Sequence, residues 1–173
     1  MDPKDLNLHP EINKKLSNLL KAEKIPNIIF HGPSGSGKRV LVNDFVKQIY
    51  SDKIDELYDS VMDVNCAHGK GIKFIREELK FFAKTNMKGD STFKTIILTN
   101  ADKLTSDAQS ALRRCIELYS HNTRFFIIVE NKYRLLRPIL SRFCEIYIPE
   151  PIVNGKKINL HQHNLLKCFS NEI

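Results

Sequence analysis

A glycine-rich stretch near the N-terminus has residue types and a spacing that suit phosphate binding. It follows the pattern Gly-x-x-x-x-Gly-Lys from Gly32 to Lys38, directly after the apolar run 28–30. Glycines in such a loop let the backbone curl around a polyphosphate with its N–H groups directed inward, and the lysine adds a positive charge. We therefore predict a nucleotide-binding loop made of Gly32, Pro33, Ser34, Gly35, Ser36, Gly37, Lys38 and Arg39.

The last residue of this loop is unusual. Ser or Thr normally follows the lysine, and its hydroxyl ligates Mg²⁺. Here the residue is Arg39, and a guanidinium cannot coordinate a cation. The loop can thus hold a nucleotide while having lost one of its metal ligands.

The length and composition of the chain fit a single domain. It has 173 residues, of which 42% are hydrophobic, which suffices for one core and leaves no room for a second full domain. No apolar run approaches the roughly eighteen residues that cross a bilayer, and the charged N-terminus lacks the apolar region of a signal peptide. We expect an intracellular protein without a membrane partner.

The cysteines and the net charge are less specific. No Cys-x-x-Cys pair occurs, so we expect neither a metal site nor a disulfide framework, and reduced thiols instead. The cysteines are Cys66, Cys115, Cys144 and Cys168. The net charge of +7 is compatible with a polyanionic partner and equally with an ordinary basic domain.

Apolar runs alternate with helical patterns along the chain. The runs lie at 27–30, 61–64, 95–98, 125–129 and 145–148. Apolar residues three and four apart indicate helices at 11–22, 40–50, 72–87, 106–119 and 135–143, and a short one at 159–169. Because buried strands separated by helices form parallel sheets, we predict an α/β fold with a five-stranded parallel sheet and helices on both faces. Ligands of such sheets bind beyond the carboxyl ends of the strands, where the glycine-rich loop lies.

Several blocks of the sequence resemble one family in the family's own order. They lie at 8–27, 65–76, 102–117 and 138–143. The most distinctive is Asp102-x-Leu104-Thr105-x-x-Ala108-Gln109-x-Ala111-Leu112-Arg113-Arg114-x-x-Glu117. On these residues the chain resembles the AAA+ ATPase domain of a clamp-loader small subunit, of the replication factor C family, over 6–151. The resemblance implies a P-loop AAA+ domain at 1–151 and a short extension at 152–173 in place of the family's lid and collar.

The chain departs from the family at the end of the third strand. The family has Asp-Glu-Ala-Asp there; the first Asp helps to hold Mg²⁺ and the Glu activates water. This chain has Thr99-Asn100-Ala101-Asp102, so both carboxylates are absent. The N-terminal box that helps to hold the adenine in the family is missing as well. We therefore expect weak binding of ATP or ADP, little dependence on Mg²⁺ and little or no hydrolysis at this chain's own site.

Two residues match family positions that act at the γ-phosphate. Arg142 lies in a block similar to the Ser-Arg-Cys motif, whose arginine finger reaches the neighbouring subunit's nucleotide in trans. Asn131 matches the polar sensor residue of the family. Without the resemblance, Arg142 reads as a surface arginine that caps a short helix, and Asn131 as a turn former.

Contact with DNA is implied at one further place. Lys70 matches a family arginine at a helix start that follows duplex phosphates, and Gly71 and Ile72 come after it as in the family. Such contacts need cations and helix N-termini, so they carry no base preference. A solvated loop lysine is the alternative interpretation of Lys70.

Three hypotheses follow for the function. The first is a clamp-loader-like subunit of DNA replication that binds nucleotide with little or no hydrolysis and donates Arg142 to a neighbour. Its partners would be other clamp-loader subunits, the sliding clamp and primer-template DNA, in the nucleus or wherever DNA is replicated. The second is an active small AAA+ ATPase of replication or repair, and the third is a DNA-binding remnant without nucleotide.

Overall fold

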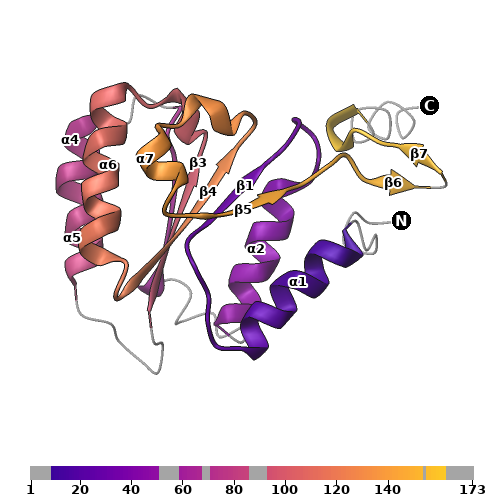
Figure 1. The fold of residues 1–173 in the computed structure, drawn as a ribbon, viewed down its shortest axis with the longest axis horizontal. Helices are drawn as coiled ribbons and strands as arrows, with labels where there is room; N and C mark the ends of the chain where they lie inside the picture. The colour runs from indigo at the N-terminus through magenta and orange to yellow at the C-terminus, as the bar shows by residue number, and fades with distance from the viewer. Residues whose placement is uncertain (1–8, 51–58, 68–70, 86–92, 154, 163–173) are drawn as a thin grey trace, which may run out of the picture.

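A parallel sheet forms the centre of the molecule. The computed structural model describes residues 9–50, 59–67, 71–85, 93–153 and 155–162. The sheet has five strands in the order β2-β3-β4-β1-β5, and all four pairings are parallel (Figure 1). The strands are β1 (Ile28–His31), β2 (Val61–Asn65), β3 (Lys94–Thr99), β4 (Thr123–Val129) and β5 (Cys144–Tyr147). The predicted α/β fold with a five-stranded parallel sheet is confirmed.

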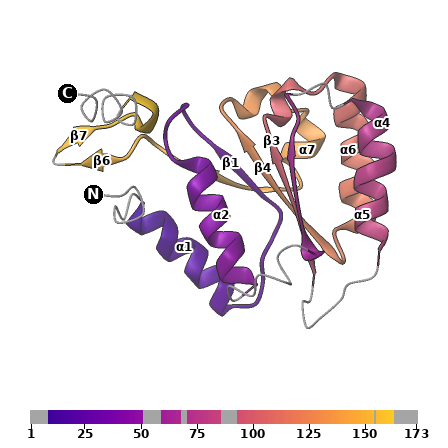
Figure 2. The same cartoon turned by 180° about the vertical axis from the view of Figure 1, so that it is seen from behind.

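Helices cover both faces of this sheet. One face carries α1 (Pro10–Lys21) and α2 (Lys38–Ile49). The other carries α6 (Ser106–Tyr119) and a helix that runs through α4 (Ile72–Phe74), the π-helical turn η1 (Ile75–Leu79) and α5 (Lys80–Lys84). Figure 2 shows the same two groups of helices from behind. None of the described helices is long and apolar enough to span a bilayer.

The strand β4 divides the core into two clusters. Its side chains alternate, so that Phe125 and Ile127 pack with α4 to α6 while Phe126 and Ile128 pack with α1 and α2. A central strand of a parallel sheet is buried on both faces, which explains why β4 reads as a continuous apolar run. Cys115 on α6 belongs to the cluster of Phe125 and Ile127, and its burial there raises the pKa of its thiol to about 11.

The predicted helix at 135–143 is much shorter in the structure. Only α7 (Arg137–Leu140) is α-helical, after the single turn η3 (Lys132–Arg134). Pro138 stands in the first turn of α7, where its missing N–H costs nothing, and Leu136 before the helix is extended. The proline therefore sets the start of this helix. The apolar residues at 135 and 136, which the prediction included, lie before it.

The chain continues past the sheet in a hairpin that the sequence analysis did not predict. It pairs β6 (Ile152–Val153) with β7 (Lys156–Lys157) in antiparallel fashion. Residues 160–162 then form a helical turn, and the rest of the helix expected at 159–169 lies outside the described residues. Cys115 and Cys144 are free thiols, Cys66 is buried, and Cys168 also lies outside the described range.

Replacing Phe126 by alanine tests the central position of β4. The Phe126 ring is fully buried and packs against the rings of Phe30 and Phe45, with centroids 6.0 and 5.6 Å away. We expect Phe126→Ala to lower the free energy of unfolding by about 3–5 kcal/mol, measured by urea denaturation followed by circular dichroism. Phe81→Ala, at a side chain that is 71% exposed, is the control, with a change of about 0.5 kcal/mol or less. Similar losses in both variants would contradict this packing.

Candidate nucleotide-binding site

The glycine-rich loop joins the carboxyl end of β1 to the N-terminus of α2. Gly37 is the residue before α2 and has φ +87°, a left-handed conformation that L side chains rarely adopt. This conformation lets the loop turn directly into the helix, so the first free N–H groups of α2 face the loop. The predicted arrangement of an apolar strand, a glycine-rich loop and a helix is present.

Lys38 folds back into the loop that precedes it. Its ammonium group donates to the carbonyl oxygens of Gly32 at 2.8 Å and Pro33 at 2.6 Å, and lies 3.3 Å from the Ser36 hydroxyl. Burial lowers the pKa of the Lys38 ammonium, and the nearby charge of Glu130 opposes this shift. The cation is thus held inside the loop, where phosphate oxygens can replace the carbonyl partners.

Arg39 reaches across the carboxyl end of the sheet, with its side chain 53% exposed. Its guanidinium donates to the carboxylate of Asp63 on β2 at 2.7 Å and to the hydroxyl of Thr99 on β3 at 3.4 Å. A fixed positive charge therefore stands between the first helical turn and the position of the family's metal-binding aspartate. This arrangement does not fit Mg²⁺, because the guanidinium repels a cation and offers no lone pair to it.

The two residues that replace the family's carboxylates hold the ends of the strands together. The Thr99 hydroxyl donates to the carbonyl oxygen of Val64 at 3.3 Å, and the Asn100 amide donates to the Asn65 side chain at 2.9 Å. Asn100 has φ +55°, a left-handed conformation that asparagine tolerates better than most residues. Neither side chain can accept a proton from water as a carboxylate can.

A cavity of about 410 Å³ lies between these elements. Its lining residues are Ser34, Gly35, Gly37, Lys38, Arg39, Val40, Thr99, Asn100, Ile128, Val129, Glu130, Leu160 and His161. Five of the eight predicted loop residues are among them, and Gly32, Pro33 and Ser36 contact Lys38. The loop, the end of β3 and the end of β4 thus meet at one place.

The sequence analysis missed Glu130, and the structure does not bring Asn131 into the cavity. Glu130 directly follows β4 and lines the cavity with Lys38 and Thr99. Asn131 is exposed, and its side chain accepts a hydrogen bond from the Tyr133 N–H at 2.9 Å, which caps the turn η3. An acidic residue at the carboxyl end of a strand was the available signal for Glu130.

Arg142 lies just after α7, and it is not among the residues that line the cavity. Its guanidinium contacts the Glu117 carboxylate on α6 at 2.5 Å and donates to the Pro138 carbonyl oxygen at 2.5 Å. Glu117 also lies 3.8 Å from the Arg113 side chain, one turn earlier on α6. Both partners of the Arg142 pair are 38% exposed, so this arginine stands on the surface of the chain.

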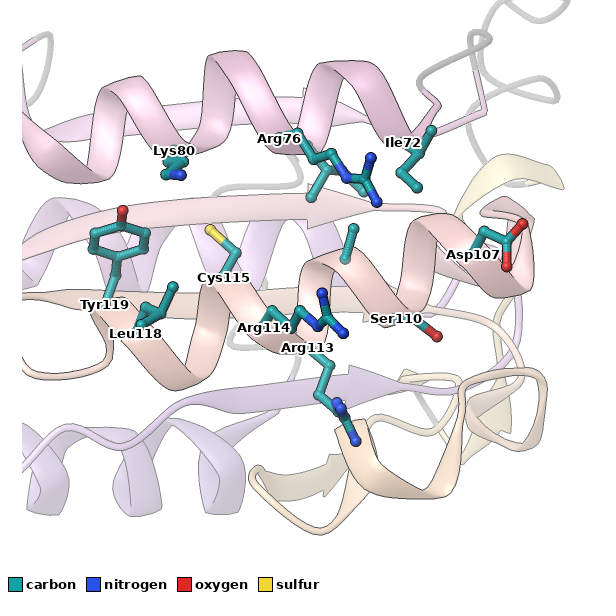
Figure 3. Close-up of a pocket in the computed structure, with 12 residues that line it drawn as sticks. Ile72, Arg76, Lys80, Asp107, Ser110, Arg113, Arg114, Cys115, Leu118 and Tyr119 are labelled. Carbon is teal, nitrogen blue, oxygen red and sulfur yellow. The ribbon is translucent and has the colours of Figure 1, made fainter.

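A basic groove of about 660 Å³ runs between α6 and the helix formed by α4, η1 and α5. Figure 3 shows Ile72, Arg76 and Lys80 on one side and Arg113 and Arg114 on the other. Asp107 is the one acidic residue that lines it. Ile72 opens α4 as the sequence predicted, whereas Lys70 lies outside the described residues.

Solved structures share this fold at low sequence identity. A DNA polymerase III gamma subunit-related protein from Thermotoga maritima superimposes with a TM-score of 0.64 at 22% identity, over 88% of this chain and 49% of that one. A mutant of RuvB from the same organism has a TM-score of 0.62 at 14% identity, over 86% and 47% of the two chains. These similarities support the α/β architecture alone.

The sequence relatives have a higher identity to this chain than the solved structures. The chain is 37% identical to replication factor C small subunit 1 of Pyrobaculum aerophilum over 142 residues, which are 82% of this chain and 42% of the relative. It is 37% identical to the replication factor C small subunit of Thermofilum pendens over 145 residues, 84% of this chain and 43% of the relative. The chain thus spans about two-fifths of the length of these relatives, and the resemblance to clamp-loader small subunits is confirmed.

A family model covers most of the chain. The model described as DNA polymerase III, delta subunit, matches residues 8–151, from just before α1 to the start of the β6–β7 hairpin. All four blocks on which the resemblance depended fall within this range. The chain therefore belongs to the DNA polymerase III delta subunit family.

Proposed function

We propose that this chain is a clamp-loader subunit that binds a nucleotide without hydrolysing it and offers Arg142 to the nucleotide of a neighbouring subunit. The similarity to replication factor C small subunits supports a role in DNA replication. One observation carries the rest of the proposal: the Arg39 guanidinium is bonded to Asp63 and Thr99. It puts a positive charge where the family needs a metal and a carboxylate.

The cations in the cavity favour an anion. Lys38 and Arg39 both line it, although Arg39 is paired with Asp63, and Glu130 is the one carboxylate among the lining residues. Backbone N–H groups of a phosphate loop add further positive potential, so a polyphosphate fits this place without a metal counter-ion. ATP or ADP is therefore the proposed ligand, bound weakly, and the chain's own residues supply its neutralising charge.

The surroundings of Arg142 support its action on another chain. Its pair with Glu117 is exposed, and exposed ion pairs contribute about 0–1 kcal/mol. A neighbour's phosphate oxygens can therefore displace Glu117 at small cost, because charge-assisted hydrogen bonds to phosphate are stronger. Glu117 then acts as a resting partner that keeps the guanidinium near the surface of α6 and α7.

The basic groove is the proposed contact for duplex DNA. Arg76 and Lys80 line the groove from one helix and Arg114 lines it from α6. Ile72, the first residue of α4, lines it as well. Cations along a groove follow the phosphate backbone and give no base preference. Besides the other clamp-loader subunits, the proposed partners are primer-template DNA and the sliding clamp. Lys70 and Ile72 are the residues proposed to contact the DNA.

A specific observation favours a second candidate, an active ATPase. Glu130 lines the same cavity as Lys38, so a carboxylate is available from β4 although β3 has lost its own. A carboxylate near the terminal phosphate can orient or deprotonate water. The two candidates differ in turnover by the isolated chain, and Glu130 is the residue that decides between them.

Nucleotide binding and turnover by the full chain test the first candidate. We expect binding of a fluorescent ATP analogue whose Kd changes less than about twofold between Mg²⁺ and a chelator, because Arg39 replaces the metal. Arg39→Thr should make binding depend on Mg²⁺, and Lys38→Ala should weaken binding under both conditions. Hydrolysis should not exceed background.

Two results would contradict this prediction. Tight binding that disappears with a chelator would mean that Arg39 does not replace the metal. Steady turnover that both Lys38→Ala and Glu130→Gln abolish would establish the active ATPase instead.

A reconstituted assembly with active clamp-loader subunits tests Arg142. We expect Arg142→Ala to lower DNA-stimulated ATP hydrolysis partially, because losing a finger costs about 10³–10⁵ in rate at one site while the other sites continue. Lys38→Ala in this chain should have a much smaller effect. Arg137→Ala, at an exposed arginine of α7, is the matched control. If complexes with wild type and with Arg142→Ala hydrolyse ATP at equal rates, the arginine-finger role is wrong and this chain has only a structural role in the assembly.

Salt-dependent binding of duplex DNA tests the groove. Arg76→Gln and Arg114→Gln should each weaken binding equally for duplexes of different sequence and lower the slope of log K against log salt by about 1. The control is Lys21→Gln, on α1 at the opposite face of the sheet. An unchanged slope in both groove variants, measured by fluorescence anisotropy, would exclude the groove as the DNA contact.

A further inference from the structure

The phosphate loop is held from outside by both ends of the described chain. The Asn159 side-chain amide donates to the Ser34 carbonyl oxygen at 2.8 Å, and the Leu160 N–H donates to the Gly35 carbonyl oxygen at 2.9 Å. The His9 ring nitrogen Nε2 lies 2.8 Å from the Ser36 carbonyl oxygen and is buried there. With the Lys38 contacts to Gly32 and Pro33, every carbonyl from residue 32 to residue 36 has a partner.

These contacts decide where the loop N–H groups point. In a planar trans peptide the carbonyl and the following N–H point in opposite directions. The N–H groups of Gly35, Ser36 and Gly37 are therefore directed away from the groups that bond the carbonyls of Ser34, Gly35 and Ser36. N–H groups that are kept away from such partners are available to an anion.

Asn159 is the residue on which this support depends. Besides Ser34, its amide donates to the Glu150 carboxylate at 3.1 Å, and its carbonyl oxygen accepts from the His161 N–H at 3.1 Å. Gly35 has φ +75°, and a Cβ there would lie 2.1 Å from the Asn159 side-chain oxygen. The asparagine and the loop are therefore in direct contact, with no space for a side chain between them.

The same segment also forms a wall of the cavity. Leu160 and His161 line it together with Lys38 and Arg39. Figure 1 shows the β6–β7 hairpin leading this segment to the start of α2. The segment does not fill the site, because a cavity of about 410 Å³ remains between it, the loop and the ends of β3 and β4.

We propose that residues 158–161 are part of the nucleotide site and that Asn159 is a positioning residue for phosphate binding. This inference rests on the proposed nucleotide binding. The ligand it concerns is a di- or triphosphate group, which the loop N–H groups hold because Asn159 and Leu160 bond the opposite side of the peptide planes. The segment supports the loop and does not block it.

Asn159→Asp tests this inference with a side chain of nearly the same shape as asparagine. The carboxylate keeps an acceptor for the His161 N–H, loses the donor to Ser34 and meets a second carboxylate at Glu150. Binding of ADP and of inorganic tripolyphosphate to the full chain should weaken by about fivefold or more, as measured by calorimetry. Asn159→Ala, which adds no charge, should also lower the affinity for both ligands. Lys156→Gln, exposed on β7, is the control and should bind like wild type.

Hydrogen exchange separates positioning from general stability. Without ligand, the peptide that spans residues 32–38 should exchange faster in Asn159→Asp than in wild type, while peptides of β4 should exchange at the same rate. A side chain that only stabilises the fold would change both sets of peptides and leave the two affinities unchanged.

The outcomes distinguish this inference from the proposed function. If wild type and Asn159→Asp bind both ligands equally, or the variant binds more tightly, the inference is wrong and the proposed nucleotide binding stands. If wild type binds neither ligand, the proposed nucleotide binding fails and the inference fails with it. Weaker binding by both Asn159 variants, with faster exchange confined to the loop, supports the inference.

Discussion

The parallel register of the sheet is the constraint on which the candidate site depends. β4 lies between β3 and β1, with Thr99 opposite Ile128 and His31 opposite Val129. Because the strands are parallel and in register, their carboxyl ends finish at one edge. The loop after β1, Thr99 and Asn100 after β3, and Glu130 after β4 meet there for this reason alone. Another strand order would separate the loop from the residues at the ends of β3 and β4 that line the cavity.

Charge then decides which chemistry this edge can support. Clamp-loader ATPases of the resembled family combine a hydroxyl and two carboxylates around a metal. This chain combines Arg39 with Thr99 and Asn100, and the guanidinium takes Asp63 as its counter-ion. An arginine keeps its charge at any physiological pH, so the positive charge of Arg39 at this edge does not depend on titration. The site is suited to holding an anion more than to cleaving one.

The glycine-rich loop and Arg142 have two different kinds of contact. The loop carbonyls are bonded by residues from distant parts of the chain, and the bond from His9 to Ser36 is buried, where a lost hydrogen bond is costly. Arg142 instead has an exposed pair with Glu117, which is easily exchanged. The loop contacts are thus long-range contacts within the chain, whereas the Arg142 contact lies at its surface.

The sequence by itself determined the local chemistry of this protein. Glycine spacing predicted the loop, apolar runs predicted all five strands, and the residue types at 39, 99 and 100 predicted a site without the usual metal ligands. These features depend on neighbouring residues, which a pattern can reveal. The proline at 138 limited α7 more than the apolar spacing indicated, because it fixes where a helix can begin.

Only the tertiary structure decided the partners of these residues. Asp63 contacts Arg39 across 24 residues of sequence, and Asn159 contacts Ser34 across 125. Glu130 lines the cavity because β4 lies beside β3, and Asn131 does not because its side chain caps the next turn. Such contacts follow from strand order and from the path of the chain after β5. No periodicity or motif encodes them, since they join segments whose separation in sequence says nothing about their distance in space.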